Sequence, residues 1–577
     1  TEFYERLAFY QYVLIEEGMR FMALIKIGKV SATEKNPTTT EKFTFWLDDG
    51  VKVQPFDIVK IENTAAREKS ITYGVIQEIF HITDSTSHLG NYVSSDFGDI
   101  NSDSLTKKLS LSYVEGNVIN NDAGNYMPVQ DGSAVYLADA DDIRMALGLD
   151  EIKNPIPCGL LKTSSGESVQ VNYNSDFLIG PEGAHLNISG ISGLATKTSY
   201  AMFLLKAIQQ TCSDVAIIIL NVKGDDLLRL NEPNTKATEA QKQEWVSMGL
   251  DFTPFSGAKF FYPYKNSKCF PYSKTALDDQ TLDYQYKTKS AFNYVYTYEH
   301  DRDKLELLFS NIEDPNFTID SILNYIMENE DFDPDCMTWE TFYERLKEYT
   351  DPDARKTKVN KDIVVQSWRK FRRLIGNSLN NDIYQNSASN TPEQNVVFLS
   401  DSVVNIKSGD TYVVDIAKLD EQLQFLVFGD VIKSVYDLKH GEHSESERTV
   451  MDPIPKKIII FVDELNKYAP DTSAKNSPIL QLLLEITERG RSEGVILFSA
   501  EQFKSAVHDR VKGNCSTHVY GRTNAIEISK SDYKYIPKVF SNMMTKLGKG
   551  DLILQHPIFA TPLKVSFPYP SYKQGDE

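Results

Sequence analysis

The stretch from His185 to Ser199, HLNISGISGLATKTS, constrains the fold of this chain more than any other. A short apolar segment leads into Gly190 and Gly193, and Lys197 and Thr198 then open an apolar run with helical spacing. Glycines allow successive backbone N–H groups to turn towards a phosphate, and the N-terminus of a helix adds partial positive charge. The stretch therefore predicts a strand, a phosphate-binding loop and a helix.

In a loop of this kind the lysine ammonium reaches the β and γ phosphates of a nucleotide, and the hydroxyl that follows it binds Mg²⁺. We assign these roles to Lys197 and Thr198, and we predict ATP and Mg²⁺ as the ligands. The other residues predicted to surround the phosphates are Gly190, Ser192, Gly193, Leu194, Ala195, Thr196 and Ser199.

The loop departs from the usual pattern G-x-x-x-x-G-K-[ST]. Counted back from Lys197, Ile191 and Thr196 stand where that pattern has glycines. A Gly/Ser-rich turn between a strand and a helix, with a surface lysine, is the alternative interpretation. The loop alone leaves both open.

A second stretch, 456–464, favours the nucleotide site. It reads KKIIIFVDE, an apolar run that ends in two carboxylates. A buried parallel strand presents such acids at its carboxyl end, where ligands bind. We predict that Asp463 belongs to the Mg²⁺ shell and that Glu464 orients or deprotonates the attacking water. The alternative is a buried strand that ends in a solvated acidic turn.

Gln502 follows another apolar run, Val495–Phe498. A polar side chain at this strand end can sense the γ-phosphate and position water, and we include Gln502 among the predicted catalytic residues. An ordinary loop glutamine is the alternative.

The remaining chain predicts an α/β protein with a P-loop (RecA-like) parallel sheet, an N-terminal small β-barrel and a helical insertion. Short alternating runs in 23–137 predict the barrel, 139–147 a closing helix that Gly148 ends, and 153–159 a proline-punctuated linker. Helical spacing occurs in 321–328, 338–349 and 363–379. The predicted parts are an N-terminal extension 1–22, the barrel 23–150, the first ATPase part 151–274, the insertion 275–390 and the second ATPase part 391–577.

Composition excludes some classes of protein. The formal net charge of −20 argues against a surface coated for nucleic-acid binding, although a ring with a locally basic pore is still compatible with it. The basic residues of 369–373 could touch DNA, but a solvated face paired with the acidic segment 328–335 is the preferred interpretation.

Five cysteines without C-x-x-C spacing predict reduced thiols, no zinc and a cytoplasmic protein. No apolar run approaches the ~20 residues that cross a bilayer, and 1–18 lack a signal-peptide pattern, so we expect no membrane association.

Taken together, the motifs resemble the HerA branch of the HerA/FtsK family of ring-forming DNA-translocating ATPases. The β region resembles the HAS-barrel of that family, and the collinear elements are His185 before the loop, Asp463-Glu464, Arg489-Gly-Arg491, Ser499-Ala-Glu-Gln502, 548–554 and 562–565. The resemblance implies a homohexameric ring, double-stranded DNA as a partner, and an effector protein such as a nuclease or a sirtuin-like NADase, as in some bacterial antiphage systems.

The resemblance also places the Arg-Gly-Arg element at a subunit boundary. A P-loop ATPase needs positive charge on the γ-phosphate in the transition state, and rings often supply it from the adjacent subunit. We predict Arg491 as this arginine, with Arg489 and Arg522 as second choices. The alternative for Arg491 is pairing with Glu488 or Glu493 on a surface turn. The function predicted is an ATP-driven DNA translocase or helicase, and its rival is an ATP-binding scaffold that activates the effector.

Overall fold

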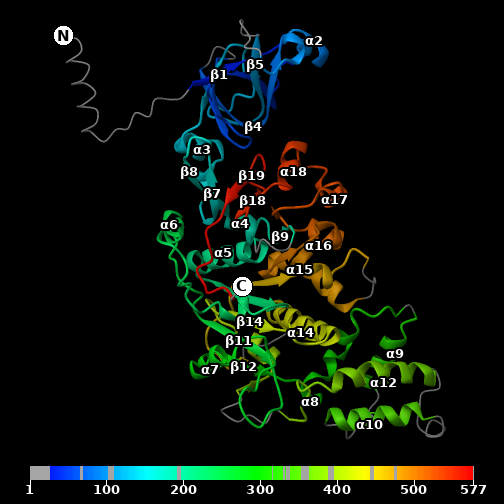
Figure 1. Cartoon of the computed structure of the whole chain (residues 1–577). Coiled ribbons are helices and arrows are strands. Elements are labelled where there is room, and N and C mark those ends of the chain that lie inside the picture. Colours follow the sequence, from blue (N-terminus) through cyan, green and yellow to red (C-terminus); the bar gives the residue numbers. More distant parts are fainter. Residues whose placement is uncertain are drawn as a thin grey trace. The chain divides into compact units, whose positions relative to one another are not determined.

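The computed structural model describes residues 26–64, 69–101, 109–191, 196–314, 316–328, 332, 338–351, 363–387, 395–441, 448–472 and 477–575. The chain forms two compact units (Figure 1). The first contains Thr1–Glu151 and Leu161–Val169, and the second contains Ile152–Leu160 and Gln170–Glu577. The predicted N-terminal extension, 1–22, lies outside the described residues.

In the described part of the first unit, antiparallel strands close into a barrel in the order β1-β2-β5-β4-β3-β6. Their bounds are Lys26–Val30 (β1), Lys42–Leu47 (β2), Ile58–Asn63 (β3), Ser70–Thr83 (β4), Ser110–Asn121 (β5) and Ala134–Leu137 (β6). Alternate side chains such as Phe43 and Phe45, or Val59 and Ile61, fill the interior, as the two-residue period of a strand requires. The predicted small barrel is confirmed.

Two short helices accompany the barrel, α2 (His88–Val93) between β4 and β5, and α3 (Ala140–Ala146) after β6. Asp139 caps α3 in a capping box, and Gly148, at φ +63°, follows its last turn. Lys60 of β3 pairs with Asp142 of α3 at 2.8 Å. The closing helix lies where the sequence predicts it.

A thirteen-stranded sheet, most of it in the second unit, has the order β13-β12-β11-β14-β10-β15-β16-β9-β17-β18-β19-β7-β8 among the described residues. All pairs from β13 to β17 are parallel, and β17-β18-β19-β7 are antiparallel. The bounds are Pro155–Lys162 (β7), Ser168–Asn174 (β8), Leu186–Ser189 (β9), Val215–Asn221 (β10), Ala258–Pro263 (β11), Ala291–Tyr294 (β12), Val396–Val397 (β13), Thr411–Asp415 (β14), Lys457–Asp463 (β15), Val495–Glu501 (β16), Thr517–Tyr520 (β17), Asp551–Gln555 (β18) and Leu563–Ser566 (β19).

The central order β10-β15-β16-β9-β17 places β16 between the strand before the phosphate loop, β9, and the acidic strand, β15. This arrangement is that of a RecA-like P-loop core, so the predicted α/β fold is confirmed. The predicted linker 153–159 is wrong, because most of it belongs to β7, next to β19. Pro155 begins that strand, where its missing N–H is tolerated.

Several helices pack against the sheet. The described helices of this unit are Ser175–Leu178 (α4), Thr196–Thr211 (α5), Glu239–Ser247 (α6), Asp279–Lys287 (α7), Tyr298–Asp301 (α8), Thr318–Glu328 (α9), Trp339–Thr350 (α10), Val365–Leu379 (α12), Leu399–Val404 (α13), Glu421–His440 (α14), Pro478–Glu493 (α15), Asp509–Gly513 (α16), Ala525–Ile528 (α17) and Lys538–Met544 (α18).

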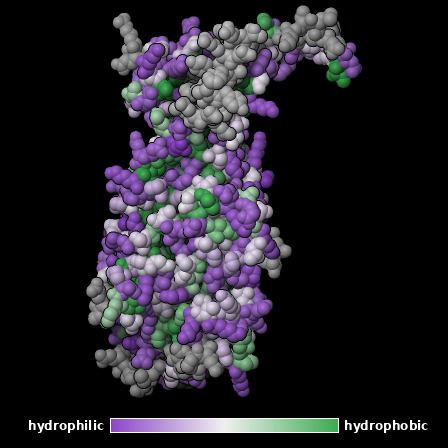
Figure 2. Space-filling view, turned by 90° about the vertical axis from the view of Figure 1, so that its left-hand side faces the viewer, coloured by the Kyte–Doolittle hydropathy of each residue, from purple (hydrophilic) through white to green (hydrophobic). Residues whose placement is uncertain are grey.

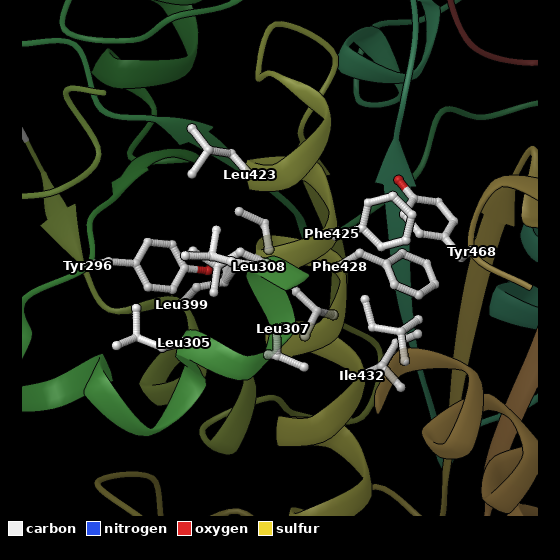
Figure 3. Packing of buried hydrophobic residues seen from close by; sticks show 14 of the residues in the cluster. Tyr296, Leu305, Leu307, Leu308, Leu399, Leu423, Phe425, Phe428, Ile432 and Tyr468 are labelled. Atoms are coloured by element: carbon white, nitrogen blue, oxygen red, sulfur yellow. The ribbon is translucent and has the colours of Figure 1, made fainter. Parts of the chain in front are cut away.

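The largest core lies around α14. This helix is apolar on nearly every side because it is buried between neighbouring elements, including the 3₁₀ segment Arg302–Phe309 and α15. Figure 3 shows Phe425 and Phe428 of this helix beside Tyr468, with the rings of Phe428 and Tyr468 stacked 3.7 Å apart. The same core includes Ile458, Ile460 and Val462 of β15.

The predicted insertion, 275–390, is only partly helical. Helices α9, α10 and α12 lie where the spacing predicts them, and α10 and α12 pack against each other. However, 291–294 forms β12, a strand of the sheet that pairs with β11. On α12, Arg369 donates to the Thr350 carbonyl and Arg372 to the Thr350 hydroxyl at the end of α10. Most of the acidic segment suggested as the partner of these arginines lies outside the described residues.

The surface seen in Figure 2 is mainly hydrophilic, with small hydrophobic patches between polar residues. Among the residues that the structure describes, no helix combines the length and the apolar character that crossing a lipid bilayer demands.

Candidate functional site

The start of the phosphate loop is held between the ends of two strands. The Gly190 N–H donates to the carbonyl of Glu501, which ends β16, and the Ile191 N–H donates to the carbonyl of Arg522, just after β17. Gly190 has φ +156°, and a Cβ at this position would lie 3.1 Å from the Cα of Gly521. A side chain is therefore disfavoured here, because it would need the backbone of Gly521 to shift. Four predicted loop residues, Ser192, Gly193, Leu194 and Ala195, lie outside the described residues.

Lys197 lies in the first turn of α5, with Thr196 before it and Thr198 and Ser199 after it. Its side chain is buried, and Nζ donates to the Gly190 carbonyl at 2.6 Å. Burial lowers the pKa of this ammonium, while the carboxylate of Asp463 acts in the opposite direction. A buried ammonium beside a helix N-terminus favours an anionic ligand at this position.

The acidic strand meets this helix directly. Thr198 Oγ1 donates to Asp463 Oδ2 at 3.2 Å, across 265 positions of sequence. Asp463 is buried at the end of β15, and Glu464 follows in a left-handed conformation, with φ +60°. The turn is held by the Glu464 N–H, which donates to the Ala500 carbonyl at 2.7 Å. The hydroxyl of Thr198 and the carboxylate of Asp463, which are predicted to hold Mg²⁺, therefore lie together.

Lys223 is a residue of this site that the sequence analysis did not select. It follows β10, which is the neighbour of β15. Its Nζ lies 3.2 Å from Asp463 Oδ2 and 3.1 Å from Glu464 Oε1. The signal in the sequence was weak, because a charged residue after a buried strand is common.

Glu501 is a second residue that the sequence analysis missed. It lies just before Gln502, its side chain is completely buried, and it accepts a hydrogen bond from Asn187 of β9. Burial raises the pKa of Glu501 to about 8, although Asn187 and the ammonium groups of Lys504 and Lys197 act in the opposite direction. Gln502 itself is partly exposed just beyond the same sheet edge, since Asp463 pairs with Ala500 in the register.

Glu501 predicts a dependence of stability on pH. Its pKa is higher in the folded than in the unfolded chain, so between about pH 5 and pH 8 unfolding releases a proton and stability falls as pH rises. Glu501→Gln does not titrate. As pH rises through this window, we expect the free energy of unfolding of the variant to increase relative to that of the wild type by up to ~1.4 kcal/mol per pH unit. Denaturant unfolding at pH 5.5 and pH 8 measures the difference, and equal pH slopes for the two proteins would contradict the assignment.

The three candidate arginines lie at different places. Arg489 and Arg491 are exposed residues of the last turns of α15, not of a surface turn, because the helix continues to Glu493. Arg491 donates to the Glu182 carbonyl at 2.8 Å. The alternative partner Glu488 pairs instead with Arg510. Arg522, whose carbonyl holds Ile191, lies beside the phosphate loop of its own chain, and its Nε donates to the Thr545 carbonyl.

A cavity of about 450 Å³ opens over α5 and the strand ends. Its lining includes Thr196, Lys197, Thr198, Ser199, Lys223 and Asp463. Two further lining residues, Tyr572 and Gln574, come from the C-terminal segment. This segment is anchored beside the cavity by the Lys573 ammonium, which pairs with Glu232 at 2.9 Å.

The residues present fit a nucleotide with Mg²⁺. The helix N-terminus and the buried ammonium of Lys197 suit phosphates, and the oxygens of Thr198 and Asp463 are the hard ligands that Mg²⁺ prefers. The ammonium of Lys223 already places a cation on both carboxylates.

No protein-family model matches this chain, and no curated protein is similar to it in sequence. Solved structures with a similar fold include the bacterial conjugative coupling protein TrwBΔN70, with 11% identity and a TM-score of 0.40 over 68% of this chain and 88% of that one. VirB4 of Thermoanaerobacter pseudethanolicus has 11% identity and a TM-score of 0.40, over 71% of this chain and 96% of that one. The genome-packaging NTPase B204 of Sulfolobus turreted icosahedral virus 2 has 17% identity and a TM-score of 0.22, over 30% and 72% of the two chains. Likenesses this weak carry no information about function.

Proposed function

We propose that this chain is an ATP-hydrolysing P-loop ATPase that assembles as a ring and moves or grips duplex DNA together with an effector protein. One observation carries the ATPase part of the proposal. Thr198 of α5, next to Lys197, donates to Asp463, the last residue of β15, which Glu464 follows, at one edge of a RecA-like sheet, although the two pairs lie far apart in the sequence.

The roles follow from position. Lys197 binds and orients the β and γ phosphates, and Thr198 and Asp463 hold Mg²⁺, which neutralises charge on the phosphates. Glu464 has a partly exposed carboxylate beyond Asp463 and accepts a proton from the attacking water. Gln502 directly follows β16, the strand that pairs with β15, and orients that water.

Two substitutions separate the acidic roles. Glu464→Gln keeps the shape of the side chain and removes the base, so we expect ATP binding to persist and turnover to fall by about 10²–10⁴-fold. Asp463→Asn should instead weaken the dependence of nucleotide binding on Mg²⁺. Binding of a fluorescent ATP analogue, measured with and without Mg²⁺ beside steady-state hydrolysis, tests this division. Equal losses of nucleotide affinity in both variants would contradict it.

The finer part of the proposal is a cytoplasmic, homohexameric DNA translocase or helicase of HerA type that works with a nuclease or a sirtuin-like NADase in antiphage defence. The motif resemblance and the closed N-terminal barrel support it. Within this proposal, residues 23–150 act as the HAS-like barrel, and 151–274 with 391–577 act as the ATPase. Stimulation of hydrolysis by duplex DNA tests the translocase.

A second candidate function is an ATP-binding scaffold that organises and activates the effector. The barrel unit favours it through exposed apolar side chains around α2, which has no buried residue: Leu89, Tyr92, Val93, Phe97, Ile100, Leu109 and Leu111. Exposed apolar residues in such number are typical of docking surfaces. The two candidates differ in one result. The scaffold predicts that the effector assembles on the ring and that duplex DNA leaves the rate of hydrolysis unchanged.

A further inference from the structure

A hydrogen-bonded turn after β10 positions Lys223 beside Asp463 and Glu464. Asn221, the buried last residue of β10, donates from Nδ2 to the Gly224 carbonyl at 3.1 Å and to Asp415 Oδ1 at 3.0 Å. Gly224 takes φ +68°, which reverses the chain directly after the lysine. The side chain of Lys223 is therefore directed by a fixed backbone.

The ammonium of Lys223 and the hydroxyl of Thr198 share one acceptor. Both lie 3.2 Å from Asp463 Oδ2. Lys223 also reaches Glu464, which makes it the cation that joins the two adjacent carboxylates. Asp463 is 3% exposed, so its charge is poorly screened by solvent and depends on this counter-charge.

A metal ion on Thr198 and Asp463 would need the same oxygen. Mg²⁺ binds its ligands at about 2.0–2.1 Å in a strict octahedron, which leaves no room for an ammonium on the same lone pairs. The side chain of Lys223 is 52% exposed and long, so it can leave the carboxylates without disturbing the core.

We propose that Lys223 is a built-in substitute for the metal ion, which neutralises Asp463 and Glu464 in the nucleotide-free protein and is displaced when Mg²⁺ arrives with the nucleotide. This inference rests on the proposed nucleotide site. Lys223 is then a positioning residue, because its ammonium preserves the geometry of the acidic pair between catalytic cycles. Mg²⁺ must compete with this ammonium for the carboxylate of Asp463.

The test measures binding rather than turnover. The full chain is titrated with Mg²⁺ at a fixed concentration of a fluorescent, slowly hydrolysed ATP analogue. Lys223→Met removes the competitor, so we expect its half-saturating Mg²⁺ concentration to fall about fivefold, the size expected for a half-exposed ion pair. Lys223→Arg keeps the charge and should behave like the wild type. Lys456→Met, which removes an exposed lysine paired with Asp214 at the opposite end of β15, serves as the matched control and should change nothing.

Thermal unfolding supplies a second readout. Without Mg²⁺, Lys223→Met leaves two uncompensated carboxylates, so we expect a lower Tm than that of the wild type, and a larger rise when Mg²⁺ is added. Lys223→Gln replaces the methionine variant if that variant does not fold. The inference on Lys223 is overturned if the variant needs as much Mg²⁺ as the wild type, or more. If the wild type still binds nucleotide in a Lys197-dependent way, the proposed function stands. Absence of Lys197-dependent binding in the wild type overturns the proposed function as well.

Discussion

Lys197→Ala is expected to abolish ATP hydrolysis. The ammonium of Lys197 is buried at the start of α5 and donates to the Gly190 carbonyl beside the phosphate loop. A charge preorganised in this way stabilises the transferring phosphoryl group far more than a solvated one. Steady-state phosphate release should therefore fall to the background of the assay.

A lysine on the same helix provides the control. Lys206 is also buried, but it donates to the Pro254 carbonyl, nine residues and about 13 Å further along α5. Lys206→Met should lower stability and leave the rate of hydrolysis per folded subunit near that of the wild type. Wild-type turnover in Lys197→Ala would show that this loop does not bind the phosphates.

Arg491→Ala is expected to reduce hydrolysis about 10³-fold without loss of nucleotide binding, as when an arginine finger is removed. Arg491 lies at the end of α15, just before β16 begins, whereas the phosphate site lies beyond the end of β16. Seven strand residues separate the two ends, or about 20 Å. Arg491 therefore cannot reach the site of its own subunit, and any catalytic role requires an adjacent one.

Mixing experiments test this arrangement. Rings that combine Arg491→Ala with Lys197→Ala subunits contain some interfaces with an intact loop and an intact arginine, so part of the turnover should return. Arg510→Ala, which removes an exposed arginine paired with Glu488 of α15, is the matched control, and Arg489→Ala tests the second choice separately. No recovery in mixtures shown to form mixed rings would remove Arg491 from the catalytic residues, and Arg522, on the loop side, would then be tested.

The part of the site that follows strand ends was predictable from the sequence. Lys197 follows a glycine turn, and Asp463 and Glu464 follow an apolar run. Both patterns predict the carboxyl end of a strand, and parallel strands bring these ends to one edge of the sheet. The structure places Thr198 against Asp463 accordingly. Four loop residues between Gly190 and Thr196 stay predictions.

Lys223 and Glu501 could not be selected in this way. The contact of Lys223 with the acids depends on which strand lies beside β15, and strand order is a property of the whole sheet. Glu501 ends a strand that is buried on both faces, so no alternation marks the direction of its side chain.

Two elements differ from what their local sequence suggests. The surface turn suggested as the alternative for Arg491 is wrong, because α15 continues through Gly490 to Glu493. A Cβ on Gly490 would lie 2.7 Å from the Val495 carbonyl, which explains the glycine inside the helix. The helix ends instead at Gly494, with φ +77°. The prolines of 153–159 suggested a linker, whereas most of this segment belongs to β7.

The most direct test of the account is an experimental structure of the full chain with Mg²⁺ and ATPγS. We predict phosphates at the N-terminus of α5 within reach of Lys197, Mg²⁺ on Thr198 and Asp463, and Lys223 displaced from Asp463 Oδ2. Nucleotide bound elsewhere, or no nucleotide at saturating concentration with the α5 N-terminus still closed by the Lys197 contact to Gly190, would contradict it.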